Sequence, residues 1–253
     1  MDTAEPPAVP VIDAILRSIP ASADVRLLDL RVGPYWTAVQ TSAGTGMAST
    51  MAGEPQRQAR VPIAAAGRLR SADPLDLTEL LRSASAPEAA VGMAAVNALL
   101  GTPEGRTEDG NAKGILNERA EGRVVAIIGH FPFVDSLRKS CRELWVFERG
   151  RGRGPGDLGP EHVAEVLPHA EVVAISATTL INHTLQDILP FIRPNAFTMM
   201  LGPSTPMAPL LLELGFDVLC GTIVEDPQRV LRAVEQGAVT SQIGGVRRVC
   251  LWG

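Results

Sequence analysis

The C-terminal half alternates short apolar runs with helical segments, and this alternation constrains the fold more than any other feature. Residues 123–129 read RVVAIIG, a continuous β-branched run typical of a strand buried on both faces. Further strand-like runs follow at regular intervals: ELWVFE, EVVAIS, AFTMMLG, DVLCGTIV and VRRVCLW. Helix-like segments separate them, and such alternation predicts parallel pairing through right-handed crossovers. We therefore predict an α/β protein with a Rossmann-like parallel sheet in residues 118–253.

The N-terminal half has a different pattern. A helix is predicted over residues 11–19, and three strand-like segments then suggest an antiparallel meander at residues 25–32, 33–41 and 44–54. Two helices follow, PLDLTELLRSA and APEAAVGMAAVNALLG. The second is apolar almost all round, so we expect it to be buried. Strands followed by helices indicate an α+β arrangement.

A change of composition separates the two halves. Residues 101–122 hold repeated glycines among charged side chains, which is typical of a domain boundary. We therefore predict a smaller α+β domain at 11–117 and the Rossmann-like domain at 118–253. Within the second domain, residues 178–192, TTLINHTLQDILPFI, are predicted as one helix.

Composition limits the classes of partner. The net charge is −5, and neither half has the basic excess that nucleic-acid binding requires. No apolar run is long enough for a membrane helix, and residues 1–10 lack the apolar stretch of a signal peptide. The three cysteines, Cys141, Cys220 and Cys250, form no CxxC pair and suit reduced, mostly buried thiols. We expect a cytoplasmic protein whose partner is a small molecule or metal; whether it forms a homo-oligomer stays open.

Polar residues follow each predicted parallel strand, where open α/β sheets bind ligands. The candidates are Gly129, His130, Pro132, Glu148, Arg149, Thr178, Thr179, Asn182, Gly202, Ser204 and Thr205. The first strand end has one glycine instead of GxGxxG, which disfavours ordinary NAD binding. Thr178 or Thr179 is expected to cap the next helix, whose N–H groups would then form an anion site.

Several of these side chains have alternative interpretations. His130 could be a metal ligand, a general base or a loop histidine bonded to backbone. Glu148 could hold ribose hydroxyls, bind a metal beside His130, or pair with Arg149. Arg149, Arg151 and Arg153 could receive a phosphate or carboxylate, although such runs are more often simply solvated.

Four segments in order, GHFPF, FER, TTLINHT and GPSTPM, resemble the family of putative heavy-metal chelation proteins. The helix AAVGMAAVNALL resembles the enolase-N-terminal-like domain that precedes the Rossmann-like domain in that family. The resemblance implies a site at the junction of the two domains and a role with heavy metals or metal-chelating molecules. It adds Thr45, Gly46 and Asn97 to the candidates. At His183 this chain departs from the small residue found in the family.

These observations predict a small-ligand or metal-handling protein with its site in the cleft between the domains, at the strand ends. Whether it is an enzyme stays open. One alternative is an enzyme that binds a nucleotide-like cofactor such as S-adenosylmethionine; another is a non-enzymatic interaction module. A divalent metal ion, held by His130 and Glu148, or S-adenosylmethionine are the cofactors considered.

Overall fold

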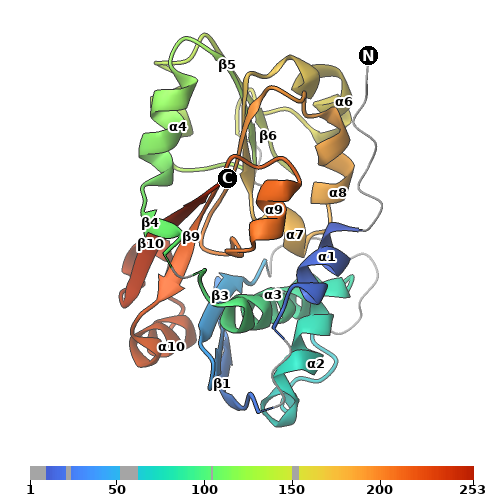
Figure 1. Cartoon of the computed structure of the whole chain (residues 1–253), viewed down its shortest axis with the longest axis vertical. Helices are drawn as coiled ribbons and strands as arrows, with labels where there is room; N and C mark the ends of the chain where they lie inside the picture. Colours follow the sequence, from blue (N-terminus) through green and yellow to red (C-terminus); the bar gives the residue numbers. More distant parts are fainter. Residues whose placement is uncertain (1–9, 21–23, 52–61, 104, 150–153) are drawn as a thin grey trace.

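The computed structural model describes residues 10–20, 24–51, 62–103, 105–149 and 154–253. Its elements form two sheets, a small one near the N-terminus and a larger one from the C-terminal half. The two sheets lie one beyond the other along the longest axis of the molecule (Figure 1). The predicted α/β fold class is confirmed. None of the helices in the described residues has the length and apolar character needed to traverse a bilayer.

The small sheet is the predicted antiparallel meander. Its strands, in spatial order, are β1 (Leu27–Val32), β2 (Trp36–Thr41) and β3 (Thr45–Ser49). The part of the third predicted strand beyond residue 51 lies outside the described residues. Helix α1 (Val11–Arg17) precedes the sheet and ends two residues before its predicted end. We call β1 to β3 with α1, α2 and α3 the front lobe.

Helix α3 covers one face of the small sheet, and α2 packs against α3. Helix α2 (Pro74–Glu79) begins at Asp73, whose carboxylate accepts the Leu75 N–H, and it continues as a 3-10 turn (Leu80–Arg82). A second short 3-10 turn (Leu69–Ser71) precedes it. Helix α3 (Ala86–Leu100) is buried along nearly its whole length, as its all-round apolar pattern predicts.

The larger sheet has the spatial order β4-β10-β9-β8-β7-β5-β6. Its strands are β4 (Thr107–Asp109), β5 (Val124–Ile128), β6 (Glu143–Phe147), β7 (Val172–Ser176), β8 (Phe197–Leu201), β9 (Val218–Val224) and β10 (Val246–Trp252). Strands β5 to β9 are parallel, as predicted. The parallel prediction is wrong for β10, which runs antiparallel to β9 and β4. After β9, helix α10 (Pro227–Glu235) packs on the small sheet instead of crossing back over the larger one, so β10 starts at the end of the sheet where β9 finishes.

Helical segments connect the strands of this larger sheet. They are α4 (Ala112–Ala120), α5 (Val134–Leu137), a 3-10 turn (Pro160–His162), α6 (Val163–Val166), a 3-10 turn (Leu167–His169), α7 (Thr178–Ile181), α8 (Leu185–Ile188), a 3-10 turn (Leu189–Phe191), α9 (Pro209–Glu213), α10 (Pro227–Glu235) and a 3-10 turn (Thr240–Gln242). We call the larger sheet with these segments, except α10, the main lobe.

The single helix predicted over residues 178–192 is broken into α7, α8 and a 3-10 turn. Between α7 and α8 the Asn182 Oδ1 accepts the Thr184 N–H at 3.2 Å and its hydroxyl at 2.7 Å. Such local bonds compete with the helix. His183 adopts a left-handed backbone with φ of 61°, and its Nε2 lies 2.7 Å from the Leu81 carbonyl. The asparagine therefore ends one helix and starts a turn that contacts the front lobe.

Helix α10 packs on the face of the small sheet opposite α3. Val230, Leu231 and Val234 of α10 share a buried cluster with Trp36, Ala38 and Met47. The C-terminal half thus covers one face of the small sheet (Figure 1). The domain division between residues 117 and 118 stays a prediction. Strand β4 precedes this point and α4 spans it, and both pack with the larger sheet.

Candidate functional site

The topology gives one edge of the larger sheet a special position. Its parallel strands have the order β6-β5-β7-β8-β9, which is the 2-1-3-4-5 order of flavodoxin-like sheets. The chain leaves β5 toward β6 on one side, and it continues from β7 toward β8 on the other. Loops after β5 and β7 therefore diverge, and the crevice between them is where such sheets bind ligands.

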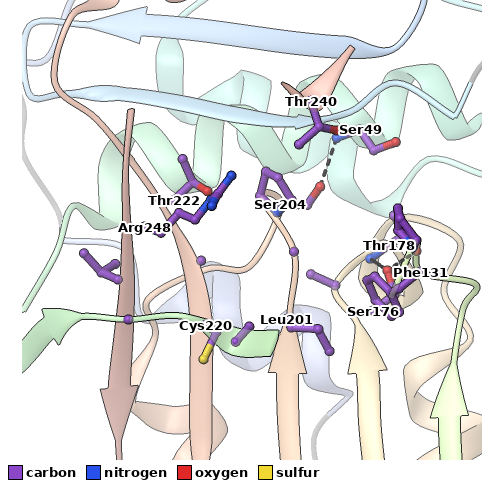
Figure 2. Close-up of a pocket in the computed structure, with 18 of the residues that line it drawn as sticks. Ser49, Phe131, Ser176, Thr178, Leu201, Ser204, Cys220, Thr222, Thr240 and Arg248 are labelled. Atoms are coloured by element: carbon purple, nitrogen blue, oxygen red, sulfur yellow. Dashed lines mark hydrogen bonds between the residues drawn. The ribbon is translucent and has the colours of Figure 1, made fainter. Parts of the chain in front are cut away.

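A cavity of about 350 Å³ lies at these strand ends, between the two lobes. Figure 2 shows Cys220 and Leu201 on the strands below it, and Ser49 and Thr240 on the opposite side. The Phe131 and Phe133 rings stack with centroids 5.2 Å apart and form an apolar wall. Hydroxyl groups also line this cavity: Ser49, Ser176, Thr178, Ser204, Thr222 and Thr240.

Arg248 brings a positive charge to the same cavity. It stands opposite Thr222 across the β9 and β10 strands, and Figure 2 shows the two side chains together beside Ser204. Within the described residues its guanidinium makes no hydrogen bond or ion pair. The preceding residue differs, because Arg247 pairs with Asp109 and Glu225 on the other side of the strand. An exposed, unpaired guanidinium at an apolar cavity suits an anion.

A second cavity of about 290 Å³ adjoins the first, with Ser49, Ser176 and Thr178 lining both. Further residues that line it follow the ends of β5, β6 and β7: Gly129, Glu148, Arg149, Thr179, Asn182 and Thr184. Gly129 has φ of 102°, a left-handed conformation that favours glycine. A third cavity of about 370 Å³ continues past Glu148, Arg149 and Thr184. We call the first two cavities together the cleft.

Glu148 holds the loop after β5. Its Oε2 accepts the His130 N–H at 2.8 Å, and its Oε1 accepts the Arg149 N–H at 2.6 Å. The His130 ring points elsewhere, because its Nδ1 lies 2.8 Å from Oδ2 of the buried Asp157. His130 is therefore absent from the cleft lining, although its neighbours line it. Within the described ranges, no three His, Cys, Asp or Glu side chains are arranged to hold a metal ion.

The threonines after β7 do not form the expected cap. Helix α7 has four residues and begins after Ala177, with no side-chain cap bond. The Thr179 hydroxyl donates to the Ser176 carbonyl at 2.8 Å, and the Thr178 hydroxyl lies 2.8 Å from that of Ser176. The predicted capping role is therefore wrong, and so short a helix offers no anion site. Thr178 instead presents its side chain to both cavities.

The loop after β8 joins the lobes. Ser204 is buried, and its Oγ accepts the Ser49 N–H at 2.9 Å (Figure 2). The Asn97 Nδ2 donates to the Ser204 carbonyl at 3.1 Å and to the Met47 carbonyl at 3.0 Å. Gly202 and Pro132 line the cleft, whereas Thr205 is buried behind it. Ser204 and Asn97 thus fix the front lobe on the strand ends.

Two candidates from the front lobe lie in packing positions. A Cβ on Gly46 would come within 2.2 Å of the Ala94 carbonyl oxygen, so β3 and α3 touch through their backbones there. Thr45 pairs with Gln40 at the start of β3. Neither residue lines the cavities described. Arg151 and Arg153 of the predicted anion-binding loop lie outside the described residues.

Sequence reasoning missed part of the lining. Phe131 and Phe133 stood within a quoted motif but were not chosen, and Ser176 ends a strand, so the strand-end rule could have found all three. Trp36 and Ser49 come from the front lobe, where no such rule applies. Arg248 reaches the cleft because β10 is antiparallel, which places the beginning of this strand at the ligand edge.

The fold and the cleft define a two-lobed α/β protein: a Rossmann-like main lobe whose ligand edge is closed by a front lobe. Two family models, both described as putative heavy-metal chelation, match residues 12–100 and 112–252. Together they cover most of the sequence, so the chain belongs to this family, as its motifs predict.

Solved structures of the family share the whole fold. A protein of unknown function from Desulfitobacterium hafniense DCB-2 is 24% identical, with a TM-score of 0.79 over 96% of this chain and 97% of that one. A protein of unknown function from Pyrococcus horikoshii is 19% identical, with a TM-score of 0.78 over 96% and 98%. An uncharacterized protein of Methanocaldococcus jannaschii is 28% identical over 149 residues, which span 57% of this chain and 58% of that protein.

Proposed function

We propose that this protein binds a small organic anion of the metal-chelating type in the cleft between its lobes. The observation that carries this proposal is the position of Arg248: an unpaired guanidinium at a cavity walled by Phe131 and Phe133. An apolar pocket with a few convergent polar groups is the usual form of a small-molecule site. The family description agrees with a chelating ligand.

A bare metal ion is a less suitable occupant. Borderline metals need about three or four nitrogen, oxygen or sulfur ligands at roughly 2.0–2.3 Å. Glu148 already accepts two main-chain N–H groups, and the His130 ring is directed to Asp157. A ligand that brings its own donor atoms would leave the protein to recognise carboxylates and an apolar body, which are the features that this cleft complements.

The hydroxyl groups of the cleft would orient such a ligand. Thr222 stands opposite Arg248, and Thr178 and Ser176 line both cavities. Each hydroxyl can donate one hydrogen bond and accept two. An anionic group at Arg248 and a second polar group near Thr178 would place the ligand body along the Phe131 wall.

A nucleotide-like cofactor such as S-adenosylmethionine is a second candidate. One observation favours it: Glu148 ends the second parallel strand, where Rossmann-type proteins hold ribose hydroxyls, and it lines the second and third cavities. The interaction module remains a third reading, and it predicts no response to any small molecule.

Thermal unfolding with a panel of probes separates these readings. The panel contains dipicolinate (pyridine-2,6-dicarboxylate, an aromatic chelating anion), Zn²⁺ alone, Ni²⁺ alone, and S-adenosylmethionine. A probe that binds the folded protein raises its stability by about RT ln(1 + [L]/Kd). We expect dipicolinate to raise the melting temperature and the metal ions alone to leave it unchanged. A shift with Zn²⁺ or Ni²⁺ alone, or with S-adenosylmethionine alone, would overturn the proposal.

Replacing Arg248 tests the anion contact. We expect Arg248→Met to weaken dipicolinate binding roughly 10-fold or more, because a charge-assisted hydrogen bond is lost. Isothermal titration calorimetry measures the change in Kd. Arg232→Met is the matched control, because it removes the same charge from an exposed position on α10 away from the cleft. Equal affinities in the two variants would remove Arg248 from the site.

A further inference from the structure

Two cysteines stand directly opposite each other beside the cleft. Cys220 of β9 and Cys250 of β10 are Cα partners in the antiparallel pair. Opposed residues project to the same face of a sheet, and both side chains lie in the same buried cluster. In the sequence 29 residues lie between them, so the sequence alone does not predict that they are neighbours.

The hydrogen-bond pattern shows which kind of pair they form. The Gly253 N–H donates to the Asp217 carbonyl, and the Glu225 N–H donates to the Gly245 carbonyl. Hydrogen-bonded pairs alternate with non-bonded ones along an antiparallel ladder, so the pair at Cys220 is non-bonded. Cα atoms of such pairs are about 4.5 Å apart, within the roughly 4.4–6.8 Å that a disulfide spans. The two sulfurs can therefore join without movement of the backbone.

The two thiols differ in access. Both are buried, but Cys220 is 4% exposed and is one of the residues that line the first cavity (Figure 2), whereas Cys250 is 0% exposed. The backbone of Gly110 covers Cys250 so closely that a Cβ there would lie 2.2 Å from its Sγ. Cys220 is thus the thiol that a small molecule in the cleft can meet first, and Cys250 is reached through Cys220.

We propose that Cys220 and Cys250 form a redox-active dithiol in the wall of the cleft, which low-molecular-weight disulfides oxidise. The Cys220 thiolate attacks one sulfur of the small disulfide, whose S–S bond breaks and releases one small thiolate. The Cys250 thiolate then attacks the Cys220 sulfur and releases the second. The two thiol protons pass to the leaving thiolates, so the protein loses two electrons and the small disulfide becomes two thiols.

Cys141 supplies an internal comparison. It lies between α5 and β6, partly exposed, and burial raises the pKa of its thiol. It is part of neither strand of the pair, so it should take no part in the internal disulfide. The redox proposal does not depend on the proposed ligand and stands or falls separately.

The test counts thiols in the folded protein. The chain is equilibrated with excess oxidised glutathione or with reduced glutathione, quenched with acid, and labelled with N-ethylmaleimide in denaturant. We expect three labels by mass spectrometry after reduction. After oxidation, Cys141 should carry a label or one glutathione, and Cys220 and Cys250 should carry neither. Trypsin cleaves after Arg248, so residues 249–253 should remain attached to the fragment that contains Cys220 in the oxidised sample.

Variants complete the test. Cys141→Ser should still lose both remaining thiols to an internal disulfide, whereas Cys250→Ser should yield no internal disulfide. Oxidation should raise the melting temperature of the wild type by about 5–10 °C, because it closes a loop of some 30 residues, and leave that of Cys250→Ser unchanged. Three labels in oxidised glutathione, glutathione on Cys220 without a link to Cys250, or an internal disulfide that includes Cys141, would overturn the proposal. These outcomes are measured on the wild-type protein, so the test does not depend on whether a variant folds.

Discussion

Glu148 shows how one side chain can have a role that its position in the sequence does not reveal. The strand-end rule marks it as a ligand group, and it does line the second cavity. Its carboxylate also accepts the N–H groups of His130 and Arg149 through separate oxygens. The glutamate therefore fixes the loop that follows β5, and this loop carries the Phe131 wall of the cleft.

Replacing this carboxylate by an amide tests the role in the loop. Glu148→Gln keeps one acceptor oxygen but turns an N–H₂ group toward the other main-chain donor. We expect the free energy of unfolding to fall by about 0.5–1 kcal/mol, since a bond to a charged acceptor is lost at an exposed position where water partly replaces it. Urea denaturation measures it. Glu165→Gln, on the exposed side of α6, should change little; equal midpoints for the two variants would contradict this role.

At the scale of elements, the sequence predicts those strands and helices that a local pattern of apolar residues determines. Strands β5 to β9 match their apolar runs, and α3 is buried as its composition requires. The direction of a strand and the continuity of a helix depend on more than local pattern. β10 has the same composition as a parallel strand, and it is antiparallel because α10 packs on the small sheet instead of crossing back over the larger one. The break between α7 and α8 depends on Asn182, whose side chain replaces a helical hydrogen bond.

The contact between β3 and α3 predicts a strong effect of one methyl group. Gly46→Ala would place Cβ 2.2 Å from the Ala94 carbonyl oxygen, so strand and helix must separate. We expect a loss of about 2–3 kcal/mol in the free energy of unfolding, as for other overpacked cores. Chemical denaturation of the variant measures this loss.

Gly114→Ala is the matched control for this substitution. Its Cβ would have its nearest neighbour at 3.5 Å, and it lies inside α4, where alanine is the better helix former. This variant should be as stable as the wild type or more stable by up to about 1 kcal/mol. A Gly46→Ala protein with wild-type stability would show that the close approach of β3 to α3 is not maintained.

At the scale of the whole molecule, the cleft exists because two lobes are held in one position. Asn97 and Ser204 connect the front lobe to the strand ends, and a continuous buried cluster runs through both lobes. Helix α10 crosses back to cover the front sheet. Sequence patterns locate residues along strands, so they indicated the main-lobe side of the site. They could not supply Trp36, Ser49 or Arg248, because these depend on lobe packing and strand direction.

The most direct test of the proposed function is a crystal structure of the protein soaked with dipicolinate. The account predicts electron density between the lobes, with one carboxylate at the Arg248 guanidinium and the pyridine ring against Phe131. Density at another surface, or an empty cleft in crystals where calorimetry records binding, would contradict it.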